Sequence, residues 1–97
     1  MMKVVDYHRA FYFLLELDGE YYIDVNCNRG PVGFSVTVQL NRSEKMHYKN
    51  QGSDFSYNLA EVIMKKSDPE HPRNIKDKDL LDLVHESIMQ WKQQTGN

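Results

Sequence analysis

The chain contains four histidines, and their spacing decides whether a metal site can be inferred from the sequence. They stand singly, at His8, His47, His71 and His85. None of the four has a second ligand at a sequence spacing that would make a metal site without help from the tertiary fold. Asp82, His85 and Glu86 share part of one helical surface, but such spacing is far more common in surface ion clusters. We therefore predict no metal site.

Cys27 is the single cysteine of the chain, and it lacks neighbours that would activate a nucleophile. It falls at an inward position of a predicted strand, where a thiol acts as a small buried hydrophobe. Gly30 and Gly33 flank Pro31 and Val32, which does not match a phosphate-binding loop that opens a helix. The sequence predicts no catalytic residue and no cofactor, and the chain is not expected to be an enzyme.

Carboxylates are concentrated between Arg9 and Arg29, where the chain has no other lysine or arginine. The four acidic residues are Glu16, Asp18, Glu20 and Asp24. Tyr12 and Tyr22 lie among them, and tyrosines supply large contact areas at modest entropic cost. Clustered carboxylates accelerate and orient association with a basic partner. We predict that these six residues form a partner-binding surface.

Three runs of alternating apolar and polar residues predict the sheet that carries this surface. They cover residues 11–17, 21–27 and 34–40, and this period of two is typical of antiparallel strands with one packed face. Residues 28–33 are rich in turn formers and predict a wide loop. A fourth strand over residues 4–7 would extend the meander.

The turn between the first two runs decides which side chains share a face. A two-residue turn of Asp18 and Gly19 would pair Phe13 with Asp24 and place a carboxylate in the apolar row. We prefer a three-residue loop over residues 17–19, which pairs Phe13 with Ile23. The opposite face then carries an island of Tyr12, Leu14 and Tyr22. That island is either exposed or covered by a helix or by the N-terminal segment.

After the third run the apolar spacing changes to three and four, which predicts helices. Ser43 can cap a short helix over residues 44–51. A second helix follows Ser53 or Asp54 and stops near Ser67.

A loop and a long helix complete the chain. Two prolines within residues 68–74 exclude both a helix and an inner strand there. Helical spacing returns at Asp77 and ends before Gly96, which predicts a helix long enough to lie across the sheet, with Trp91 in the core.

These elements predict one α+β domain over residues 1–97. Its sheet is a three- or four-stranded antiparallel meander, followed by two or three helices, with the C-terminal helix packed on the sheet. The composition, 40% hydrophobic and 27% charged, is ordinary for a soluble protein, and no signal peptide or membrane span is recognisable. We expect a cytoplasmic protein. The net charge of -2 argues against nucleic acid as a partner.

Three stretches of the chain carry a resemblance to a known class of proteins. They are residues 21–28 leading to Gly33-Phe34, Tyr48 and Gly52 leading to Leu59-Ala60, and residues 73–75 leading to Ile88 and Trp91. Together they resemble small bacterial immunity proteins of polymorphic or contact-dependent toxin systems. The resemblance implies a protein that binds a toxin domain and covers its active site or a nearby surface. Many such toxins are nucleases, so the implied partner is a basic toxin domain.

The expected function is therefore that of a non-catalytic protein-binding module, monomeric or homodimeric. Two alternatives stay open. One is an oligomeric accessory or regulatory subunit in which the strand over residues 34–40 pairs with its mate or the face of Tyr12, Leu14 and Tyr22 self-associates. The other is a small ligand-binding protein, whose mark would be a deep enclosed pocket holding at least two of the histidines and carboxylates.

Overall fold

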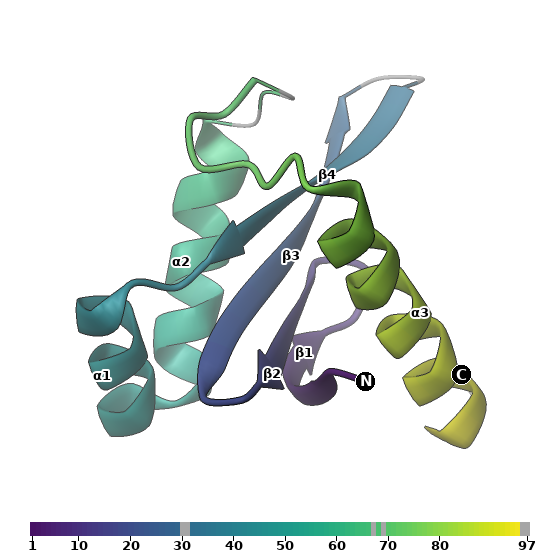
Figure 1. Ribbon diagram of the computed structural model, residues 1–97. Coiled ribbons are helices and arrows are strands. Elements are labelled where there is room, and N and C mark those ends of the chain that lie inside the picture. The colour runs from purple at the N-terminus through teal and green to yellow at the C-terminus, as the bar shows by residue number, and fades with distance from the viewer. Residues whose placement is uncertain (30–31, 67, 69, 96–97) are drawn as a thin grey trace.

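The computed structural model describes residues 1–29, 32–66, 68 and 70–95, and it confirms the α+β class. Four strands form an antiparallel meander in the order β1-β2-β3-β4, and three helices follow (Figure 1). The elements are β1 (Lys3–His8), β2 (Tyr12–Leu17), β3 (Glu20–Arg29), β4 (Val32–Gln39), α1 (Arg42–Gln51), α2 (Ser53–Lys65) and α3 (Lys78–Thr95). Helices α1 and α2 lie on one side of the sheet and α3 lies on the other. The sheet is therefore the middle of three layers.

The turn between β2 and β3 differs from the predicted three-residue loop. Leu17 pairs with Glu20, so the turn consists of Asp18 and Gly19, with φ angles of 51° and 83°. Two successive positive φ angles make a type I′ turn, whose twist matches that of the flanking strands and which favours Asp-Gly. Phe13 therefore pairs with Asp24, the register that we had rejected.

The register of β2 is thus shifted by one residue from the prediction. Relative to β3, every β2 side chain therefore lies on the opposite face of the sheet from the face that we predicted. Tyr12 and Leu14 now join Ile23 in the core beneath α2, while Leu15 joins Tyr22 in the core beneath α3. Tyr12, Leu14 and Tyr22 are 2%, 0% and 8% exposed. The predicted island is thus buried, and its members lie on two different faces.

The ribbon of β3 and β4 is longer than predicted. Asn28 pairs with Gly33 and Arg29 pairs with Val32, so the strands continue into residues that we had assigned to a wide loop. Gly30 and Pro31 lie outside the described residues. Cys27 pairs with Phe34 and is 1% exposed, which confirms the prediction of a buried thiol.

The helix ends follow from side-chain caps. Asn41, and not the predicted Ser43, caps α1, because its side chain accepts from the Glu44 amide while Glu44 accepts from the Asn41 amide. Asp77 caps α3 by accepting from the amides of Asp79 and Leu80. Helix α2 ends at Lys65, and Ser67, where we had expected its end, lies outside the described residues. No helix in the described part of the chain is long and apolar enough to cross a membrane.

The segment between α2 and α3 is held against the free edge of β4. The amide of Thr37 donates to Asn74 Oδ1 at 3.0 Å, and its carbonyl accepts from the Ile75 amide at 2.8 Å. Arg73 makes two bonds to the Glu44 carboxylate and a third to the carbonyl of Gln39. These bonds fix the path of the chain into α3, and hence the position of α3 over the sheet.

Candidate functional site

The six predicted contact residues do not form one surface. Tyr12 and Tyr22 are buried on opposite faces of the sheet, so they cannot both anchor one partner. Asp24 is half-buried beside α3, whereas Glu16 lies on the α2 side of the sheet, since it pairs with Tyr21. The predicted arrangement of tyrosines among carboxylates was wrong, because it depended on a three-residue loop over residues 17–19 and not on the observed Asp18-Gly19 turn.

The remaining carboxylates gather at the tip of the β2–β3 hairpin, where two of them have partners within the chain. Glu16 accepts a bond of 2.9 Å from the Gly19 amide. Glu20 forms an ion pair of 3.1 Å with Lys45 of α1, and this pair, together with a bond from Gln39, lowers the Glu20 pKa. Asp18 is exposed at the turn. The tip is acidic as expected, and among its three carboxylates Glu20 is the one that forms an ion pair within the described residues.

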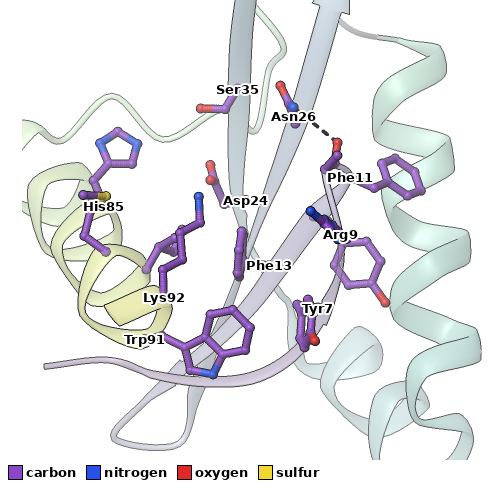
Figure 2. Close-up of a pocket in the computed structure, with 14 residues that line it drawn as sticks. Tyr7, Arg9, Phe11, Phe13, Asp24, Asn26, Ser35, His85, Trp91 and Lys92 are labelled. Atoms are coloured by element: carbon purple, nitrogen blue, oxygen red, sulfur yellow. Dashed lines mark hydrogen bonds between the residues drawn. The ribbon is translucent and has the colours of Figure 1, made fainter. Parts of the chain in front are cut away.

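A second site, which the sequence analysis missed, is a groove between α3 and the sheet. Its volume is about 740 Å³, and it begins at the turn between β1 and β2, over residues 9–11 (Figure 2). Polar side chains of six residues line it: Arg9, Asp24, Asn26, Ser35, His85 and Lys92. It is open to solvent along its length, because Tyr7 and Met89 at its margins are 46% and 57% exposed. It is thus a surface groove, unlike the deep enclosed pocket expected of a ligand carrier.

Three aromatic rings form the wall of the groove. Trp91 lies edge-on to Tyr7 at 4.6 Å between ring centroids and to Phe13 at 5.5 Å, and Tyr7 stacks near Phe13 at 6.1 Å. Trp91 was predicted in the core but is half-buried, with part of its ring available to solvent. The cluster gives the groove a rigid apolar surface, since each ring is supported by the two others.

Asp24 is the carboxylate of the groove, and its position explains its protonation behaviour. Burial raises the Asp24 pKa, and a bond of 2.8 Å from Thr37 Oγ1, the charge of nearby His85 and the Ser35 hydroxyl oppose that rise. Thr37 thus engages one oxygen of this carboxylate. Its main effect is to give the groove one partly shielded negative charge.

Two cations face this carboxylate from opposite sides of the groove, as Figure 2 shows for Arg9 and Lys92. Lys92 Nζ lies 5.6 Å from the centroid of the Phe13 ring, a cation–π contact. Among the described residues, neither cation has a carboxylate within ion-pair distance. The groove therefore carries a surplus of positive charge over its aromatic wall.

The turn that presents Arg9 is held in an unusual conformation. Ala10 has a φ of 62°, which residues other than glycine adopt at a cost of roughly 1 kcal/mol. Asn26 stabilises it, since its side chain donates to the Ala10 carbonyl at 3.3 Å and its amide donates to the Phe11 carbonyl at 2.8 Å (Figure 2). These two bonds from β3 fix the turn, and with it the base of the Arg9 side chain.

A polar network on the other face of the sheet serves a structural purpose. Asp6 accepts from the hydroxyls of Ser53, Ser56 and Tyr12, and the Tyr12 hydroxyl lies 3.1 Å from Ser56 Oγ. Burial is the main reason that the Tyr12 pKa rises to about 12. Ser56 is fully buried, so no substrate reaches its hydroxyl. The network ties the first turn of α2, which has no side-chain cap, to β1.

Comparison with protein families, curated proteins and solved structures finds no match for this chain. The resemblance to immunity proteins therefore stays a prediction. Within residues 1–29, 32–66, 68 and 70–95, no three histidine, cysteine, aspartate or glutamate side chains are grouped so as to hold a metal ion.

Proposed function

We propose that this chain is a non-catalytic protein-binding module of the immunity type, which neutralises a toxin domain by covering part of its surface. We further propose that it binds with the groove between α3 and the sheet. The supporting observation is the composition of that groove. Partly exposed tryptophan, tyrosine, methionine and arginine are the side chains enriched at the centres of protein interfaces.

The geometry of the groove favours binding over hydrolysis. Ser35, His85 and Asp24 line it together, and these are the residue types of a catalytic triad. A triad needs the histidine between hydroxyl and carboxylate, but here the carboxylate takes its short bond directly from Thr37. In the described residues His85 forms no hydrogen bond with Ser35 or Asp24, so it is not positioned to remove a proton from the hydroxyl.

The test uses the product of a toxin-like gene adjacent to the gene for this chain, with its active site inactivated. Met89→Glu removes an apolar contact and places a charge on the rim of the groove, so it should weaken binding by at least about tenfold, or roughly 1.4 kcal/mol. Met46→Glu is the matched control, because Met46 on α1 is 58% exposed and lies across the sheet. Calorimetry measures both affinities.

Three outcomes decide the proposal. Loss of binding in Met89→Glu alone supports the groove. Full binding by Met89→Glu would contradict the groove if another variant loses binding. Loss of binding in Met46→Glu would place the contact on α1, and loss in the double variant Glu16→Gln/Glu20→Gln would place it at the hairpin tip. No complex with the toxin domain would contradict the immunity role.

One observation favours the oligomeric alternative. Strand β4 carries no charged side chain, and the hydrogen bonds that the described residues 73–75 make to its free edge fall at Thr37 and Gln39. Ser35 lies two residues before Thr37 on the same strand, so its backbone N–H and C=O, like those of Thr37, point away from β3. Uncharged open edges pair readily with other strands. A concentration-dependent dimer in light scattering would favour this second candidate.

A further inference from the structure

We infer that the partner element seated in the groove carries carboxylates, which pair with Arg9 and Lys92 while an adjacent apolar side chain packs on Trp91. The inference rests on the proposed function and adds to it the chemistry of the partner. It predicts an acidic segment with an apolar or aromatic residue between its charges.

The charges of the groove carry this inference. Four other cations, Lys45, Arg73, Lys76 and Lys78, lie within 4 Å of carboxylates of the chain. Arg9 and Lys92 have no such partner in the described structure, although Asp24 lies in the same groove. Asp24 is half-buried and bonded to Thr37, so it offers little to a cation from outside. A partner carboxylate would compensate the two cations and meet no exposed like charge.

The positions of the two cations fit a bridging ligand. Arg9 extends from a turn whose backbone Asn26 holds in place, so binding has to order the Arg9 side chain but not the turn that carries it. Lys92 rests near the Phe13 ring on the α3 side. Figure 2 shows Phe13 between the two cations, with Trp91 and Tyr7 below it in this view. An ion pair formed beside this apolar wall becomes partly shielded from water once the partner covers the groove, and it is then stronger than one on an open surface.

A basic or neutral partner element fits less well. A lysine or arginine entering the groove would meet the Arg9 and Lys92 charges, and only the partly shielded Asp24 would attract it. A neutral apolar segment would leave both cations unpaired beside a less polar neighbour, which costs desolvation free energy. The charge pattern therefore selects for carboxylates.

The chain supplies its own reporter, because Trp91 is its single tryptophan and lies in the groove wall. The probe is a capped hexapeptide, Gly-Glu-Leu-Phe-Glu-Gly, and the matched probe has lysine in place of both glutamates. We expect a saturable change in tryptophan emission with the acidic peptide and none with the basic one. Added salt should weaken the binding, because exposed parts of the ion pairs are screened.

The variant Arg9→Gln with Lys92→Gln should reduce the affinity for the acidic peptide by about tenfold or more, as expected when two interfacial charge contacts are lost. The control is Arg42→Gln with Lys49→Gln, which removes two exposed cations of α1 on the opposite side of the sheet and should leave the affinity unchanged. Thermal unfolding of both variants verifies that they are folded.

Equal binding of both peptides, or unchanged binding by Arg9→Gln with Lys92→Gln, would overturn the acidic specificity. Such a result leaves the proposed function standing if Met89→Glu still abolishes the complex with the toxin domain. If binding of neither the peptide nor the toxin domain depends on groove residues, the groove is not the binding surface and its acidic specificity is wrong as well.

Discussion

Asp24 is the residue whose protonation should be visible in the stability of the whole chain. Burial raises its pKa above the ordinary 3.8, so the folded state holds the proton more tightly than the unfolded state does. The free energy of unfolding therefore gains from Asp24 as the pH falls through the folded pKa towards 3.8, and this gain is absent at neutral pH.

Replacing Asp24 by Asn isolates this contribution. Asp24→Asn keeps an acceptor for Thr37 Oγ1 and removes the charge, so it should equal or exceed the wild type in stability at neutral pH. Its advantage should shrink as the pH falls towards 3.8, because the wild-type carboxyl then becomes protonated. Urea unfolding of both proteins across this range measures the difference. Glu44, whose pKa is lowered by Arg73, acts in the opposite sense but is common to both proteins. A stability difference that does not change with pH would contradict the buried position of Asp24.

At the scale of elements, the Asp18-Gly19 turn sets the register of the sheet. Gly19 has a φ of 83°, and a Cβ added there would meet nothing within 4 Å. Gly19→Val should therefore destabilise the fold through backbone strain alone, by about 1 to 2 kcal/mol. Gly19→Asn is the matched variant, because asparagine tolerates positive φ, and it should cost less. Urea unfolding distinguishes the two, and equal losses would show that the turn does not need the left-handed conformation.

The same turn marks how far the fold could be predicted from the sequence. Periodicity located β2, β3, β4, α2 and α3, the capping residues indicated α1, and the strand that we gave as possible at residues 4–7 is β1. It failed for β2, because residues 11–15 are apolar without interruption, as in strands that are buried on both faces. We had interpreted that run as one packed face, and this interpretation favoured the wrong turn.

The candidate site could not be predicted in the same way, because it forms only at the scale of the whole molecule. Its cations come from the β1–β2 turn and the last helix, and its carboxylate comes from β3. Trp91 was recognisable on a helical stripe, but its partner Tyr7 was placed only by the pairing of β1 with β2 and by the bulge between Val4 and Asp6. No local pattern in the sequence connects these segments.

Because the sheet has a core on each of its two faces, neighbouring residues of one strand should both be important for stability. A sheet with one packed face would not lead to this prediction. Leu14 and Leu15 are neighbours in sequence, both are fully buried, and they belong to the two separate cores on either side of the sheet. Leu14→Ala and Leu15→Ala should each cost about 2 to 5 kcal/mol of unfolding free energy. Val62→Ala on α2, at 55% exposure, should stay within about 0.5 kcal/mol of the wild type.

Because the two cores share one sheet, loss of either should destabilise the entire domain. Urea transitions followed by Trp91 emission, which reports the α3 side, and by far-ultraviolet circular dichroism, which reports all elements, should therefore coincide in both leucine variants. A small loss for one of the leucines would mean that its face is not a core. Separate transitions by the two probes would mean that α3 unfolds independently of the sheet, and the groove between them would then be too loosely held to bind a partner with defined geometry.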